Sequence, residues 1–210
     1  MELYKMSLLQ IFFAGGPVMW PILLCSIFAL TIILDRFFHL HKIKIDTQEF
    51  LNSILEKMKR HETKEALKVC DDTKSPIANI LKAGILKYDR SRAQIKEAIE
   101  DASLYEVPRL EKNLPALATI AHISPLLGLL GTVTGMVRCF QTIQAKATSF
   151  HPVSPGDLAG GIWEALLTTV AGLVVAIPTF VAYNYLVHRV NNFILEMEKA
   201  STELVNFLAE

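Results

Sequence analysis

Three long runs of apolar residues alternate with polar sequence along the chain. They cover residues 18–34, 114–143 and 158–187. The last run contains no Lys or Arg and a single acidic residue, Glu164. A helix of that length would extend about 45 Å, which exceeds the roughly 30 Å hydrocarbon core of a bilayer. The pattern therefore predicts three transmembrane helices.

A shorter apolar run, residues 8–13, precedes the first predicted span. It is followed by Gly15, Gly16 and Pro17, which are typical of a turn. We expect a short helix in the membrane interface. A cleaved signal peptide is the alternative, but the start is not basic and no A-x-A pattern follows the run.

The polar segment between the first and second spans has helical periodicity. One helix is indicated by apolar residues at positions 50, 51, 54, 55 and 58, and a second by residues 61–72. Pro76 fits the first position of a third helix, and Ser91 fits the cap of a fourth, which covers residues 91–113. We expect this fourth helix to continue into the second span without a break, bent at Pro108.

These elements predict an all-α membrane protein with three transmembrane helices, two of which extend into a cytoplasmic helical domain. We expect residues 1–41 to form a periplasmic N-terminal segment and the first span. Residues 42–113 then form the cytoplasmic helical domain. Residues 114–187 hold the second and third spans with a short periplasmic loop. Residues 188–210 form an amphipathic C-terminal helix that packs on the cytoplasmic domain or on a neighbour.

Charge sets the expected orientation of these spans. Most of the 21 Lys and Arg lie between residues 42 and 112, and by the positive-inside rule this segment and the C-terminus face the cytoplasm. The N-terminus and the 144–157 loop then face outward.

Composition excludes several classes of function. The 21 basic residues equal the 21 acidic ones, so no nucleic-acid partner is indicated. The three cysteines have no spacing typical of a disulfide framework or a metal site. No phosphate-binding loop and no G-x-S-x-G motif is present, and we expect no enzyme activity, no cofactor and no metal.

Glu164 is the candidate functional residue. A carboxylic acid at the centre of a membrane helix costs about 2.5–3.5 kcal/mol by insertion scales, so such a group by default suggests an ion or proton path. Thr168 shares its helical face, whereas Thr169 lies about 140° around the helix. Arg138 is placed near the outer end of the second span, where its side chain can reach the head groups.

Small residues mark both of the longer spans. Gly128, Gly131 and Gly135 recur along one stripe of the second span, and Gly172 lies in the third. Such stripes let helix backbones approach closely, so we expect helix packing. Pro178 can kink the third span.

Two motifs carry a resemblance to a known family. SPLLGLLGTVTGMVRCF (residues 124–140) and PGDLAGGIWEALLTTVAGLVVAIP (residues 155–178) resemble the MotA/TolQ/ExbB proton-channel family. The three-span layout is more similar to ExbB and TolQ than to MotA, which has four spans.

The resemblance implies a function and a set of partners. It implies a proton-motive-force-driven subunit of the inner membrane of a Gram-negative bacterium that forms a pentamer around a dimer of ExbD-like single-span proteins and energises a TonB-like protein. It assigns Glu164, Thr132 and Thr169 to the proton pathway. Arg138 stands where the family usually has a smaller polar residue.

Three alternatives remain open at this stage. A TolQ-like role in envelope maintenance is the main one, since the sequence does not separate it from an ExbB-like role. A membrane scaffold, in which Glu164 is a neutral packing group, and a membrane enzyme are the others. Two hydroxyl groups near a carboxylate can serve either H⁺ or Na⁺.

Overall fold

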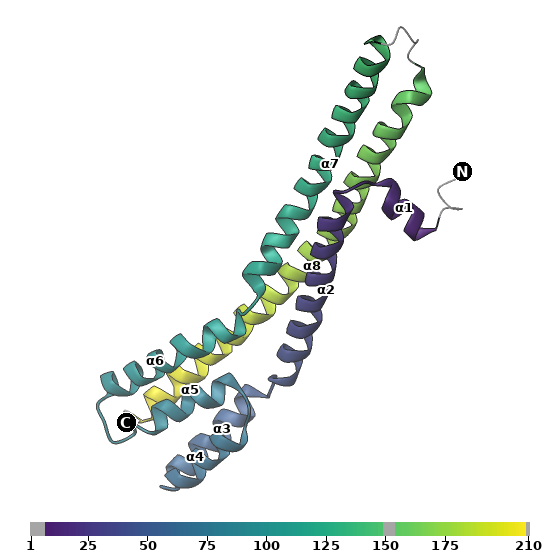
Figure 1. The fold of residues 1–210 in the computed structure, drawn as a ribbon. Helices are drawn as coiled ribbons and strands as arrows, with labels where there is room; N and C mark the ends of the chain where they lie inside the picture. Colours follow the sequence, from purple (N-terminus) through teal and green to yellow (C-terminus); the bar gives the residue numbers. More distant parts are fainter. Residues whose placement is uncertain (1–6, 149–153, 209–210) are drawn as a thin grey trace. The chain divides into compact units, whose positions relative to one another are not determined.

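The computed structural model describes residues 7–148 and 154–208. Eight helices are present in this part of the chain (Figure 1). Three helical segments are long and apolar enough to cross a membrane, and they overlap the three predicted spans. The prediction of an all-α membrane protein is therefore confirmed. Part of the expected outward loop, with the N-terminal residues 1–6, lies outside the described residues.

The chain divides into two compact units. The first comprises Met1–Leu34 and Leu114–Asn184, and the second comprises Asp35–Asn113 and Tyr185–Glu210. The helices α2 (Met19–Lys42) and α8 (Pro155–Leu208) each contribute residues to both units.

The first unit begins with the short helix α1 (Leu8–Ala14), as the apolar run at residues 8–13 predicted. Ser7 closes a capping box with Gln10, because its hydroxyl accepts the Gln10 N–H and its own N–H donates to the Gln10 side chain at 2.9 Å. Gly15 caps the C-terminal end of the helix, and Gly16 follows with φ +70°. The Phe12 ring packs edge-on against Trp20, with 5.0 Å between ring centroids, and this contact fixes α1 to the start of α2.

Helices α7 (Leu114–Thr148) and α8 run side by side in the first unit (Figure 1). The close approach depends on glycine. A Cβ atom on Gly172 would lie 2.6 Å from the Ser124 carbonyl oxygen, and one on Gly135 would lie 2.6 Å from the Gly161 carbonyl oxygen. A larger residue at either position would push the two backbones apart. Pro178 lies inside α8, which remains helical through it.

The second unit is a bundle of shorter helices. Its elements are α3 (Thr47–Lys59), α4 (Thr63–Asp72), α5 (Pro76–Ile85), α6 (Arg92–Leu110) and the C-terminal part of α8. These match the helices that the polar segment predicted, with Pro76 at the first position of α5 and Ser91 closing a capping box with Gln94. The core consists of fully buried aliphatic side chains from α3, α5, α6 and α8: Ile54, Ile80, Leu81, Ile85, Ile95 and Leu204.

The expectation of an unbroken helix from α6 into the second span is wrong. Helix α6 ends at Leu110, and Asn113 has φ +65° before α7 begins at Leu114. Pro115 has no N–H to donate to a carbonyl one turn earlier, and asparagine tolerates the left-handed conformation better than most residues. The break therefore follows from the residues after Leu110. Pro108 lies inside α6 and does not end it.

Candidate functional site

The Glu164 carboxylate lies in the first unit, where three segments meet. Glu164 is on α8 and is buried, and its carboxylate accepts a hydrogen bond from the guanidinium group of Arg138 on α7. The α1–α2 turn lies against the same carboxylate. A Cβ atom built on Gly16 would be 1.9 Å from Glu164 Oε1 and 3.4 Å from Arg138 Nη1. Only glycine fits at position 16, because the space is occupied and φ is positive.

Thr168 lies one turn after Glu164 on α8 and is completely buried. Its hydroxyl donates to the backbone carbonyls of Ala165, at 2.8 Å, and Glu164, at 3.2 Å. The side chain fills the space that the absent Gly131 side chain leaves, since a Cβ atom there would lie 2.1 Å from Thr168 Oγ1. Thr168 therefore packs the α7–α8 contact and satisfies its hydroxyl within its own helix.

Unlike Thr168, Thr169 forms a hydrogen bond to the backbone of α7. Its hydroxyl donates to the Ala165 carbonyl at 3.2 Å and to the Gly128 carbonyl of α7 at 3.3 Å. Thr132, on α7, is half-buried and donates to the Leu129 carbonyl at 2.6 Å. Both hydroxyls thus bond to backbone oxygens, while the Glu164 carboxylate bonds to Arg138.

The predicted pathway residues Glu164, Thr132 and Thr169 are therefore not brought together in the described structure, where Thr132 bonds only within α7. Glu164 is in contact with Arg138 and Gly16, whereas Thr168 and Thr169 lie along the glycine stripe of Gly128 and Gly131. In a single chain the carboxylate and these hydroxyls do not share one hydrogen-bonded cluster. This matches the angular separation of Thr169 from Glu164 on an ideal helix.

Two residues of the site do not follow from the sequence pattern. The guanidinium group of Arg138 pairs with Glu164, a contact that was not expected, whereas the expectation that this half-exposed side chain can reach the head groups stays a prediction. A signal for this pairing exists, since an arginine within an apolar helix is costly without a partner and Glu164 is the acidic residue of the third span. Gly16 fits the predicted turn, and nothing in the sequence links it to Glu164.

His122 is a further titratable side chain of α7. Its Nδ1 lies 2.7 Å from the Ala118 carbonyl, and its ring packs edge-on against Phe180 at 6.0 Å between centroids. It is a satisfied polar group beside an aromatic ring of α8.

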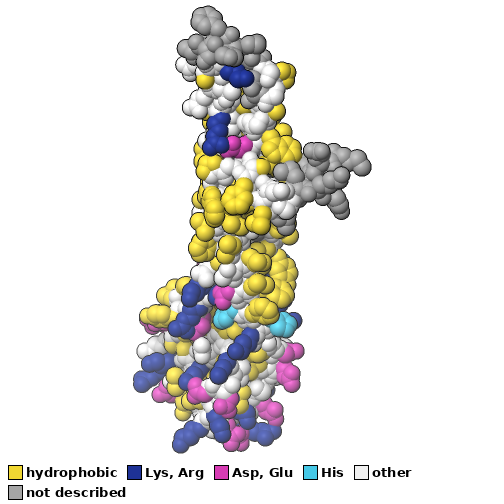
Figure 2. All heavy atoms as spheres, turned by 45° about the vertical axis from the view of Figure 1, so that its right-hand side comes forward, with side chains coloured by type: hydrophobic (Ala, Val, Ile, Leu, Met, Phe, Trp, Pro, Cys, Tyr) yellow, Lys and Arg dark blue, Asp and Glu magenta, His cyan; other side chains and the backbone are white. Residues whose placement is uncertain are grey.

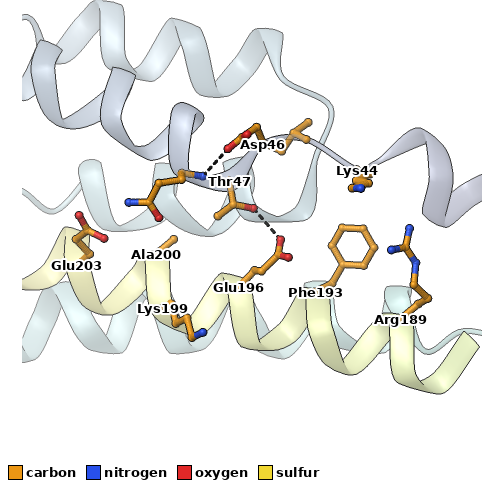
Figure 3. A pocket seen from close by; sticks show the side chains of 11 residues that line it. Lys44, Asp46, Thr47, Arg189, Phe193, Glu196, Lys199, Ala200 and Glu203 are labelled. Carbon is orange, nitrogen blue, oxygen red and sulfur yellow. Dashed lines mark hydrogen bonds between the residues drawn. The ribbon is translucent and has the colours of Figure 1, made fainter. Parts of the chain in front are cut away.

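A groove of about 420 Å³ lies in the second unit, between the α2–α3 connection and α8 (Figure 3). Thr47 donates to Glu196 at 2.9 Å, and Asp46 caps α3. The groove is lined by both basic and acidic side chains: Lys44, Asp46, Arg189, Glu196, Lys199 and Glu203. This mixture gives no preference for an anion or a cation. Among residues 7–148 and 154–208, no group of three or more His, Cys, Asp or Glu side chains is arranged to hold a metal ion.

Comparison with known proteins gives consistent matches. The model of the MotA/TolQ/ExbB proton channel family matches residues 72–199. An ExbB homolog from Methanothermobacter thermautotrophicus is 28% identical over 193 residues, covering 91% of this chain and 67% of that protein. A biopolymer transport protein of the ExbB-like type from Synechocystis is 32% identical over 171 residues, covering 81% of this chain and 80% of that protein.

The Tol-Pal system protein TolQ of Haemophilus influenzae also matches. It is 45% identical over 87 residues, which cover 41% of this chain and 36% of that protein. The family model spans more than half of the chain, including α7 and most of α8, on which Arg138 and Glu164 lie. The chain therefore belongs to the MotA/TolQ/ExbB proton channel family.

Proposed function

We propose that this chain is an ExbB-like motor subunit that uses the proton-motive force across the inner membrane of a Gram-negative bacterium to energise a TonB-like protein. The observation that carries the proposal is the buried Glu164 carboxylate within a membrane-spanning helix. A buried ionised group in a membrane is costly unless it is paired, and such groups commonly mark ion pathways. Family membership supports a proton as the transported ion.

The proposed assembly places copies of the chain around a common axis. One carboxylate per chain then becomes a ring, and a polar ring is far less costly when it faces an internal cavity than when it faces lipid. We propose a pentamer that surrounds a dimer of ExbD-like single-span proteins, with Glu164, Thr132 and Thr169 lining the pathway. In the single chain Thr132 and Thr169 bond to carbonyls, and each hydroxyl oxygen keeps acceptor capacity for a partner group.

The proposed orientation follows the distribution of positive charge. The second unit contains most of the Lys and Arg residues, and we propose that it faces the cytoplasm. Glu164 then lies in the outward half of α8. An elementary charge that crosses the membrane gains about 2.3 kcal/mol per 100 mV. That free energy per proton is sufficient to bias small rearrangements of packed helices.

A TolQ-like role is the second candidate. The observation in its favour is the 45% identity to the TolQ protein over 87 residues. The two roles share the proton pathway and differ in the protein that is driven. Deletion of the gene separates them, since loss of siderophore uptake indicates the ExbB-like role and sensitivity to detergents with leakage of periplasmic proteins indicates the TolQ-like role.

The test of the proposal replaces the carboxylate in the complete complex. Glu164→Gln keeps the shape of the side chain and removes its charge, and we expect loss of energy-dependent iron-siderophore uptake, or of detergent resistance in a TolQ-like system. Glu100→Gln is the matched control, because Glu100 is exposed on α6. Full activity of Glu164→Gln in a strain that depends on this chain would refute the proposal.

A further inference from the structure

We propose that Arg138 is an internal counter-ion that keeps Glu164 closed to protons while the chain lacks its partner. The inference rests on the proposed function of Glu164 as a proton-transfer group and concerns its regulation. In this closed state the carboxylate is ionised and paired, and proton exchange requires that the guanidinium group first moves away.

The exposure of the two side chains differs in a way that suits this role. The Glu164 side chain is 11% exposed, whereas the Arg138 side chain is 49% exposed. The buried carboxylate is held by the groups around it, and leaving it there without a partner would be costly because its charge would be unpaired in an apolar setting. A half-exposed arginine has a long flexible side chain that can turn to another acceptor. Of the two side chains, Arg138 is therefore the one with room to turn away from the pair.

The α1–α2 turn closes the carboxylate on its other side. The Gly16 backbone lies so near to Glu164 that an added Cβ atom would overlap Oε1. Water or a polar side chain therefore has no room between this turn and the carboxylate. Gly16 and Arg138 together enclose the group from two directions.

The neighbouring hydroxyls do not substitute for Arg138 in this state. Thr168 donates to the carbonyls of Glu164 and Ala165, and Thr169 donates to those of Gly128 and Ala165. Within the described residues, the Arg138 guanidinium group is thus the group that donates a hydrogen bond to the Glu164 carboxylate and balances its charge.

A partner that draws Arg138 away from Glu164 must carry a group that Arg138 can bind. A guanidinium group prefers a carboxylate in bidentate geometry, so an acidic residue on an inserted partner helix would compete with Glu164 for it. Arg138 would then pair with the partner, and Glu164 would become able to exchange a proton with water. The ion pair thus links partner binding to opening of the pathway.

The test measures proton leak through the chain alone. The purified protein is reconstituted without a partner into liposomes that contain a pH-sensitive dye, and a potassium diffusion potential is applied. We expect wild-type vesicles to match protein-free vesicles. Arg138→Gln should raise the rate of internal acidification several-fold, whereas Arg138→Lys, which keeps the positive charge, should stay close to wild type. The double variant Arg138→Gln/Glu164→Gln should return to the wild-type rate.

A second variant acts from the other side of the site. Gly16→Ala forces the carboxylate away from its position, and we expect it to leak as Arg138→Gln does. Gly160→Ala is the matched control, because an added Cβ atom there meets nothing within 4 Å. If folded Arg138→Gln and Gly16→Ala vesicles are no leakier than wild type, the proposal is overturned.

A measurement on the unaltered side chains keeps the proposal testable if both variants fail to fold. The infrared difference between wild type and Glu164→Gln, each without the partner, should contain a carboxylate band. A protonated carboxyl band in its place would overturn the proposal that Arg138 is the counter-ion of Glu164. The proposed motor function has a separate test, since it falls only if Glu164→Gln works in the complete complex.

Discussion

The two units of the chain differ most in the side chains that they expose. The second unit encloses large aliphatic residues, such as Ile80 and Leu81, and presents charged groups to its surroundings. The first unit buries several small and polar residues, among them Ser124, Thr168 and Glu164, beside a few large ones such as Leu117, and it exposes many large apolar side chains. Figure 2 shows hydrophobic side chains over the face of the first unit and charged side chains over that of the second.

This contrast shows what each unit requires from its environment. A core of buried aliphatic side chains is stabilised by the hydrophobic effect in water. Helices in lipid gain nothing from that effect and associate through close packing of small residues and through polar contacts. The Arg138–Glu164 pair is therefore found where a folded membrane unit keeps its polar groups, between helices.

The largest expected effect on the free energy of unfolding is the difference between a Leu→Ala substitution in the second unit and one in the first. Leu81→Ala removes a fully buried side chain of the second unit and should destabilise it by about 2–5 kcal/mol. Leu126→Ala removes a side chain of the first unit that is 61% exposed and should have little effect in detergent. Denaturant titration followed by circular dichroism measures both. Equal losses would contradict the contrast between the units.

A substitution at the glycine stripe should have a smaller effect, confined to the first unit. Gly131→Ala places a methyl group 2.1 Å from Thr168 Oγ1 and should cost about 1–3 kcal/mol through overpacking. Tryptophan fluorescence reports on this unit, because Trp20 and Trp163 both belong to it. Gly160→Ala is the control. An unchanged transition for Gly131→Ala would mean that α7 and α8 are not packed as closely as described.

The helices of both units are predictable from the sequence because periodicity is a local property. The helices around Phe50, Ile80 and Ile95 and the cap at Ser91 follow from residues within a few positions of one another. The separation of Thr169 from Glu164 is local in the same sense, since it follows from the 100° turn per residue of an ideal helix.

The rest depends on contacts between distant parts of the chain. The pairing of Arg138 with Glu164 and the approach of Gly16 to the same carboxylate bring together residues from three separate segments. Helical periodicity holds no information about which segments meet. The break before Leu114 is hard to predict for a different reason, since the charged and apolar pattern continues through it and only Asn113 and Pro115 mark it.

The smallest expected effect concerns the thiol in the second unit. Burial raises the pKa of Cys70 from its usual 9.0 to about 11, because the apolar surroundings disfavour the thiolate. The folded state therefore binds the proton more tightly than the unfolded state, and stability should fall as the pH rises from 9.0 towards 11.

Alkylation measures the same property directly. In a Cys25→Ser/Cys139→Ser background, the Cys70 thiol should react slowly with iodoacetamide at about pH 8 in the folded protein and much faster in denaturant, because the thiolate is the reactive form. Rapid reaction of the folded protein would show that Cys70 is not enclosed by the helices of the second unit.

The proton flux through the complete complex is the most direct test of the role of Glu164. The chain is reconstituted with the proposed single-span partner in vesicles with an imposed potential, and internal acidification is recorded for wild type, Glu164→Gln and the exposed control Glu100→Gln. The account predicts partner-dependent flux in wild type and Glu100→Gln and its loss in Glu164→Gln. Undiminished flux in Glu164→Gln would contradict it.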